Sequence, residues 1–257
     1  MKKYCAILLS TMAGFLLITL LSPSLHAFEL GARGSYWFPT FKSDARVDGS
    51  SIRGTEFNFE DNLGVDADPF PGIEIFAGLG KNHISLMYTQ GDSSAATTLS
   101  QAITFNGTTF PAGTAVNSEF KLKMLDLTYK RDLIDTRNIL AGFAISAMGK
   151  IKYLEGDMNI SSGANRASES IKVPIPMVGL GAHVGILADI LEARVEIAGI
   201  GYSSNYLFEA LADLSFTPFP FLDIHGGYKT INLHVDQDDV FLDAQFSGPY
   251  AALTVSF

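Results

Sequence analysis

Charged side chains recur at every second position in several parts of this sequence, as at Glu192, Arg194 and Glu196. Alternate residues of a β-strand lie on one face, so these runs place acids and bases together on one side of a sheet. Carboxylates beside lysines and arginines can line a polar pore or join in salt bridges across a closed space. We predict that one interior face carries Glu29, Arg33, Glu74, Asp126, Lys130, Lys150, Lys152, Glu192, Arg194, Glu196, Glu209, Asp213, Asp223, His225 and Lys229.

A catalytic or metal-binding constellation is harder to find. Residues 234–239, HVDQDD, combine an imidazole with carboxylates that can activate water, but a charged run in a loop is usually just solvated. His83, His183 and His225 stand on separate segments, and the acids of the first long loop match no calcium-loop spacing, although their oxygens suit divalent cations. We predict no enzyme activity, no metal and no cofactor. The loop acids are Asp44, Asp48, Glu60, Asp61, Asp66 and Asp68.

The N-terminus has the features of an export signal. Lys2 and Lys3 precede an apolar run over 4–21, and a small residue, Ala27, ends the segment. We predict a signal peptide over 1–27, with an uncleaved anchor as the alternative, and a single mature domain over 28–257. Removal of both lysines moves the formal charge from −9 to −11, which argues against nucleic acid as a partner. Cys5 is the only cysteine, so the mature chain has neither disulfides nor a thiol nucleophile.

The positions of the apolar residues predict the fold class. Outside the signal no stretch reaches the roughly 18 apolar residues of a membrane-spanning helix, although 47% of the chain is hydrophobic. Apolar residues instead alternate with polar ones in segments joined by short and long connections in turn, which is typical of a closed, antiparallel, up-and-down transmembrane β-barrel. A β-sandwich is the alternative. We predict about ten strands, with eight possible, over 28–38, 73–79, 84–89, 125–129, 139–152, 178–186, 193–197, 206–216, 222–229 and 247–257.

The last residues, SGPYAALTVSF, keep this alternation up to the terminal phenylalanine. Tyr250, Leu253, Val255 and Phe257 resemble the C-terminal signal that the barrel-assembly machinery reads in bacterial outer-membrane proteins. The chain is also similar to a family of uncharacterised Gram-negative outer-membrane barrels in Gly54-Thr55, in NLG at 62–64, in ITFNGTTF at 103–110, in PIPMVGLG at 174–181 and in GPY at 248–250. This resemblance implies the fold and an outer-membrane location, and it brings no assigned activity.

A ten-stranded barrel leaves little room inside, because about 8 strands enclose only side chains and open channels come at about 16. We therefore expect a narrow or plugged lumen that passes or binds small or apolar solutes. The alternative is a structural or surface-exposed barrel whose loops bind partners or lipopolysaccharide. An outer-membrane hydrolase is less favoured. Ten-stranded barrels with acids and a histidine at the outer rim resemble the omptin proteases. We expect a monomer in contact with outer-membrane lipid, lipopolysaccharide and the assembly machinery.

Three local features give further expectations. Asn106-Gly107 between short apolar segments predicts a hairpin, at the tip of a tall ribbon made by the third and fourth strands. Phe216, Phe219 and Phe221 should mark the periplasmic rim. Apolar residues change from odd to even positions near Met177, which predicts a β-bulge, and Pro174 and Pro176 would leave a lateral gap beside their strand.

Overall fold

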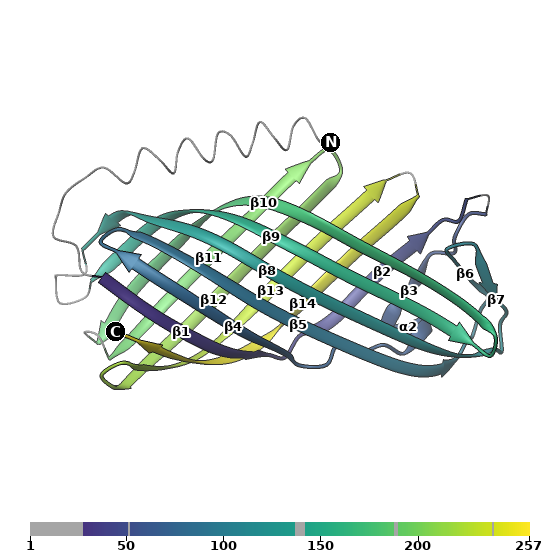
Figure 1. Cartoon of the computed structure of the whole chain (residues 1–257), viewed down its shortest axis with the longest axis horizontal. Helices are drawn as coiled ribbons and strands as arrows, with labels where there is room; N and C mark the ends of the chain where they lie inside the picture. Colours follow the sequence, from purple (N-terminus) through teal and green to yellow (C-terminus); the bar gives the residue numbers. More distant parts are fainter. Residues whose placement is uncertain (1–27, 51, 137–141, 188–189, 238) are drawn as a thin grey trace.

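The wall of the molecule is a closed barrel of ten antiparallel strands (Figure 1). A computed structural model describes residues 28–50, 52–136, 142–187, 190–237 and 239–257. The expected signal peptide over 1–27 and the start of the fifth expected strand, at Ile139 and Ala141, lie outside these residues. In the described part of the chain, no helix is long and apolar enough to cross a membrane.

Each barrel strand pairs with its neighbours in chain order, and the barrel closes where the first strand meets the last, from Gly31 opposite Ser256 to Trp37 opposite Tyr250. Most of these strands are longer than the segments in which apolar and polar residues alternate in the sequence. The wall consists of β1 (Phe28–Trp37), β4 (Phe70–Leu79), β5 (Asn82–Thr98), β8 (Ala115–Asp135), β9 (Phe143–Ser162), β10 (Asn165–Leu187), β11 (Leu191–Tyr202), β12 (Asn205–Phe219), β13 (Leu222–Gln237) and β14 (Val240–Ser256).

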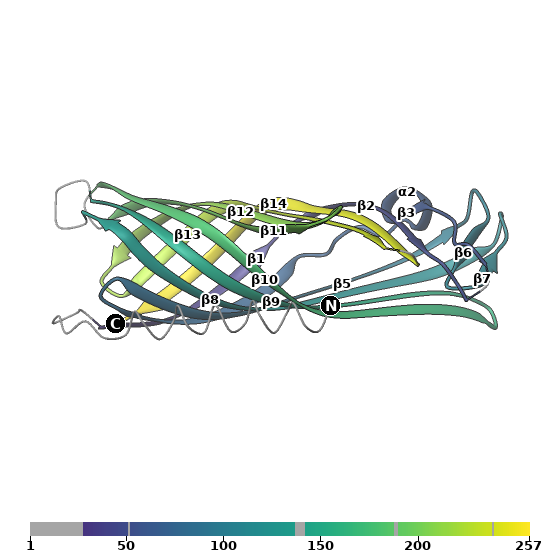
Figure 2. The ribbon, with the colours of Figure 1, turned by 90° about the horizontal axis from the view of Figure 1, so that it is seen from above.

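Short elements fill one end of the barrel. They are β2 (Thr40–Val47), β3 (Phe57–Asn58), α2 (Phe59–Leu63), β6 (Ile103–Phe105) and β7 (Thr108–Phe110). β2 continues the line of β1 beyond Pro39 and pairs with the upper part of β14. In Figure 2, α2, β3, β6 and β7 lie at the end of the barrel opposite the C-terminus. Phe28 and Phe257 lie at the same end as the tight β4–β5 and β12–β13 turns. Because short turns mark the periplasmic side of such barrels, α2, β3, β6 and β7 lie on the extracellular side.

The outer surface carries the expected apolar band. Leu125, Leu214 and Leu253 are exposed and face away from the barrel, and Ile145 lies on the same outward face of its strand. Phe216, Phe219 and Phe221 are exposed around the tight β12–β13 turn on the periplasmic side. Further exposed aromatic residues on the outer surface are Tyr36, Phe38, Tyr88, Tyr153, Tyr206 and Tyr228. Exposure of these apolar side chains to water would be unfavourable, whereas contact with lipid stabilises them.

The interior changes character along the barrel axis. Charged residues occupy the periplasmic part, whereas the extracellular part holds a core of buried apolar side chains that includes Phe41, Phe59, Phe70 and Phe246. Above the membrane the outside of a strand meets water, so apolar residues stabilise the fold there by facing inward. The apolar face of a strand therefore reverses as the strand leaves the lipid.

This reversal explains the pattern at Met177, where the predicted bulge is wrong. β10 pairs with β9 without interruption from Asn165 to Val184, and its odd-numbered residues face inward throughout. Val173 and Ile175 pack against the extracellular core, while Val178 and Leu180 face lipid. The register shift of β10 lies at its periplasmic end, between Gly185 and Leu187.

The expected tall ribbon is present but is wider than the sequence indicated, since β5, β8, β9 and β10 all rise above the rest of the wall. The Asn106-Gly107 hairpin is confirmed as β6–β7, but it is not the tip of this ribbon. It forms a separate sheet that folds over the mouth, where Asn106 N–H donates to the carbonyl oxygen of Val47 at 3.2 Å. The side chains of Ile103, Phe105 and Phe110, which belong to this hairpin, are buried.

Candidate functional site in the barrel lumen

The lumen contains a cavity of about 320 Å³ in its charged, periplasmic part. It extends from Glu29, Asp223 and Ser256 near the periplasmic end to Trp37 and Phe70 below the apolar core. Every residue that we assigned to the interior face lines this cavity except Lys152, whose side chain is fully buried among ion pairs.

Two lysines and two carboxylates close the upper part of the cavity. Lys152 Nζ lies 2.7 Å from Asp126 Oδ1 and 2.8 Å from Glu209 Oε1. Lys150 Nζ lies 2.8 Å from Glu209 Oε2 and 3.8 Å from Asp126 Oδ2. Because β8 and β9 supply three of these residues and β12 supplies Glu209, the cluster spans the lumen and ties opposite walls together.

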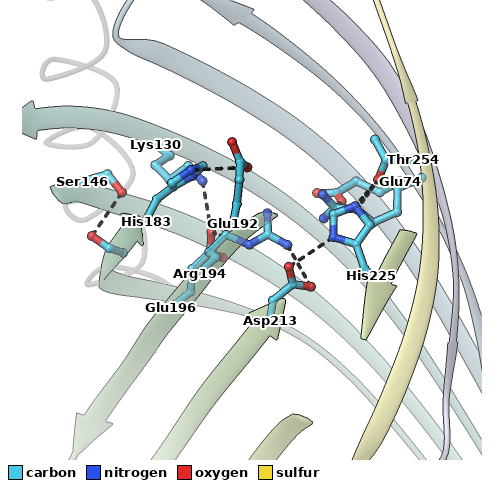
Figure 3. Close-up of polar contacts among 12 residues, drawn as sticks. Glu74, Lys130, Ser146, His183, Glu192, Arg194, Glu196, Asp213, His225 and Thr254 are labelled. Carbon is cyan, nitrogen blue, oxygen red and sulfur yellow. Dashed lines mark hydrogen bonds and ion pairs between the residues drawn. The ribbon is translucent and has the colours of Figure 1, made fainter. Parts of the chain in front are cut away.

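A second set of polar contacts runs around the wall closer to the periplasmic end (Figure 3). Arg33 contacts Glu74 at 3.1 Å through Nη1 and donates from Nε to Thr254 Oγ1 at 2.8 Å. His225 bridges Thr254 Oγ1, 2.9 Å from Nε2, and Asp213 Oδ1, 3.1 Å from Nδ1. Arg194 Nη2 lies 3.5 Å from the other oxygen of Asp213. The six strands β4, β1, β14, β13, β12 and β11 are therefore linked through their inward side chains.

Further charges pair along the opposite wall and near the periplasmic end. Lys130 Nζ donates to Glu196 at 3.0 Å, and His183 lies 3.3 Å from Glu192. His83 lies 3.2 Å from Asp132. Three histidines that the sequence left as isolated lumen or interface residues thus each lie against a carboxylate inside the barrel.

Lys229 differs from the other lumen cations. The ion pairs found among the described residues do not include it; its ammonium instead lies over the ring of Trp37, 4.9 Å from the centroid. Trp37 packs edge-on against Phe70 at 5.5 Å, at the base of the apolar core. Lys229 therefore marks the boundary between the polar and the apolar parts of the lumen.

The apolar core closes the extracellular side. Phe41 stacks on Phe246 with ring centroids 4.4 Å apart and on Phe120 at 5.3 Å. The turn of α2 brings Phe59 and Leu63 into the same core, because Asn58 caps its first turn by accepting from Glu60 N–H and Asp61 N–H, and Gly64 ends it with φ of 67°. No sequence motif marked this segment as part of the lumen.

The loop acids and the rim histidine make separate local contacts, except that Asp44 pairs with Asp243, the carboxylate beside His234. Asp48 Oδ1 accepts from Gly54 N–H at 2.8 Å, and Glu60 and Asp61 stand on the exposed side of α2. His234 Nδ1 lies 2.9 Å from Asp243, whereas Asp236 N–H donates to Asn205. Within the described residues no group of three or more His, Cys, Asp or Glu side chains is arranged to hold a metal ion.

The residues of the C-terminal pattern lie at the seam of the barrel. Leu253, Val255 and Phe257 face outward, and Phe257 exchanges backbone hydrogen bonds with Leu30 at 2.8 and 3.0 Å. Tyr250 faces inward and lines the cavity. Because the last strand is paired on both sides, the terminus is not a free sheet edge.

Pro174 lies directly opposite Tyr153 of β9, and Pro176 lies opposite Ile151. Since the ladder to β9 continues through Ile175, and alternate residues of a strand bond to opposite neighbours, both prolines face the β11 side. Among the described residues, pairing between β10 and β11 begins only at Val178 opposite Gly199. The ladder is open above this point on that side.

Comparison with solved structures supports the fold. The outer-membrane protease OmpT from Escherichia coli matches with a TM-score of 0.60 and 9% identity, over 90% of this chain and 98% of OmpT. The translocator domain of the autotransporter NalP from Neisseria meningitidis gives 0.42 and 8%, over 100% and 97% of the two chains. Ail of Yersinia pestis, in complex with a heparin analogue, gives 0.34 and 13%, over 88% and 98%. No protein-family model and no curated protein matches the chain.

The closed ten-stranded wall, its apolar outer band and the match to the fold of OmpT define an outer-membrane β-barrel protein. We accordingly assign the chain to the outer membrane. At 9% identity the match to OmpT establishes the fold and not an activity.

Proposed function

We propose that this protein is a closed barrel that acts at the cell surface and does not serve as a diffusion pore. The supporting observation is the filled extracellular half of the lumen, where α2, β3 and the β6–β7 hairpin are packed between the walls. A water-filled path would have to pass both this apolar core and the ion pairs around Lys152.

Planar-bilayer recording of the refolded mature chain tests this proposal. We expect no stepwise conductance, with a general porin in the same bilayer as the positive control. Regular single-channel steps from the pure protein would contradict a closed barrel.

The outer face of the tall wall offers a surface for lipopolysaccharide. Lys123, Glu155 and Lys172 lie side by side on β8, β9 and β10, one outward position above Leu125, Tyr153 and Pro174. Glu155 lies 3.5 Å from Lys123 and 3.3 Å from Lys172, and both lysines are partly exposed. Ammonium groups just above the lipid band are well placed for the phosphates of lipopolysaccharide, directly or beside a divalent cation bridged by Glu155.

Lipopolysaccharide that remains bound during purification can be measured by native mass spectrometry. The double variant Lys123→Gln, Lys172→Gln should retain less of it than the parent chain, whereas Arg166→Gln, at the far end of β10, should retain the same amount. Equal retention by all three proteins would remove this surface from the proposal. We propose that the chain is a monomer and that its C-terminal pattern engages the assembly machinery.

A second candidate function is lateral passage of small apolar solutes. It is favoured by the open ladder at Pro174 and Pro176, where Val173 and Ile175 lie on the inner side of the strand. Replacing both prolines with valine would restore two donors toward β11. Uptake of an apolar fluorescent solute into proteoliposomes should then fall; unchanged uptake would exclude this route.

A further inference from the structure

A hydroxyl, an imidazole and a carboxylate from three adjacent strands form a chain at the wall of the lumen cavity (Figure 3). Thr254 Oγ1 on β14 lies 2.9 Å from His225 Nε2 on β13, and His225 Nδ1 lies 3.1 Å from Asp213 Oδ1 on β12. These are the contacts that join a nucleophile, its general base and the group that orients the base. All three residues are buried and line the cavity.

Arg33, beside Thr254, and the carboxylate of Asp213 fix the direction of the hydrogen bonds in this row of side chains. A guanidinium only donates, so Arg33 Nε donates to Thr254 Oγ1 at 2.8 Å. An ionised carboxylate only accepts, so the Nδ1–H of His225 donates to Asp213. In the neutral imidazole Nε2 is then the acceptor, and the hydroxyl proton of Thr254 points at it. His225 is therefore in the tautomer that a general base needs.

Arg33 adds a second requirement for a nucleophile. Its Nε–H contacts the oxygen that would carry negative charge as the proton leaves, so its cation stabilises a developing alkoxide. Glu74, 3.1 Å from Arg33 Nη1, holds the guanidinium in this position.

We propose that Thr254, His225 and Asp213 form a nucleophilic site that hydrolyses small carboxylic esters inside the lumen. The cavity of about 320 Å³ is near the lower end of the usual range for ligand pockets, about 300–1,000 Å³, which limits the substrate to a small molecule. Carboxylates outnumber lysines and arginines among its lining residues, so an anionic substrate is disfavoured and a neutral or cationic ester is preferred. Access is from the periplasmic end, where Glu29, Asp223 and Ser256 line the cavity.

The reaction needs only water as a co-reactant. Thr254 Oγ1 attacks the ester carbonyl carbon while its proton passes to His225 Nε2. The bond to the leaving alkoxide then breaks, His225 returns the proton to that oxygen, and an acyl-Thr254 remains. Water, deprotonated by His225, attacks the acyl carbon, and Thr254 leaves with the proton from His225, which releases the free acid.

This proposal does not depend on the surface role, because a conducting barrel would carry the same three residues. The opposing explanation is that the hydrogen bonds among Thr254, His225 and Asp213 only pair buried polar groups with one another. In that case no ester is hydrolysed.

The test uses the refolded mature chain in detergent micelles and follows p-nitrophenol release from p-nitrophenyl acetate. Thr254→Val, which is nearly isosteric, should lower the rate about 100-fold or more, and Thr254→Ser should retain turnover. Thr128→Val makes the same change at another hydroxyl of the cavity wall and should leave the rate unchanged. Each variant is first shown to be folded by its heat-dependent gel mobility. An equal rate for Thr254→Val and the parent chain would overturn the proposal.

Two further readouts separate catalysis from a structural role. A fluorophosphonate probe should label the peptide that contains Thr254 in the parent chain and not in the His225→Gln variant. Asp213→Asn should lower kcat and leave KM unchanged, because Asp213 positions the base without touching substrate, and Asp213→Glu should recover part of the rate. Absence of label on Thr254 in folded protein, or equal kcat for Asp213→Asn, would count against the site.

Discussion

Lys152 shows how much a single residue contributes to closing this lumen. Its ammonium is fully buried between Asp126 and Glu209, at 2.7 and 2.8 Å. Lys152→Met should destabilise the folded barrel by about 3–5 kcal/mol, since Lys150 is then left to compensate two buried carboxylates. Urea unfolding in lipid vesicles measures this change.

A companion variant shows whether charge is the cause. Lys152→Met combined with Asp126→Asn should recover part of the lost stability, because the remaining carboxylate, Glu209, still has Lys150 as its partner. If the double variant is as unstable as the single one, the loss comes from packing and not from electrostatics.

For single residues, the sequence predicted which charged side chains face inward, because alternate residues of a strand lie on the same face. Glu192, Arg194 and Glu196 are examples. It did not predict which of them meet. His225 was recognised as a lumen residue, but its partners Asp213 and Thr254 are 12 and 29 residues away, on neighbouring strands. Only the register of β12, β13 and β14 brings them together, and register is a property of the whole sheet.

At the scale of elements, the apolar core depends on glycine at one place in β5. Gly91 lies beneath the ring of Phe70, and a Cβ at this position would overlap that ring. Gly91→Ala should displace Phe70 and destabilise the barrel by about 1–3 kcal/mol. Gly156→Ala, in β9, places its methyl group in open space and serves as the control. Equal unfolding midpoints for the two variants in urea would show that Phe70 moves aside without cost.

The strands of the membrane band were the most predictable elements, because lipid outside and charge inside give a clear alternation. Their extracellular extensions were not, since the apolar residues change sides where the solvent outside changes from lipid to water. Val173 and Ile175 in β10 therefore resembled a bulge in the sequence although the strand is continuous. In the same way, Phe57 and Phe59 gave no strand pattern, yet β3 and α2 carry them into the core.

For the whole molecule, the two ends of the barrel have different physical roles. The extracellular half is a packed apolar core between two walls of strands, and the periplasmic half is a polar cavity crossed by ion pairs. Because each half closes the lumen by a different interaction, a change in one need not open the other. A surface role outside and chemistry inside are compatible in one barrel for this reason.

The hairpin over the mouth allows this division to be tested in intact cells. Asn106 is exposed, but its N–H donates to Val47, and its side chain donates to Ser168 at 2.9 Å and to Glu169 at 3.0 Å. A tip tied in this way should resist an added protease, in contrast to the rapid cleavage expected of a free ribbon end. Phe105→Ser removes a buried anchor of the hairpin and should make the segment around Asn106 cleavable, while Thr109→Ser, on its exposed face, should not. Immunoblots of whole cells after protease treatment distinguish the two states. Rapid cleavage of the parent chain at Asn106 would show that the mouth opens readily and that the core beneath it is not a permanent closure.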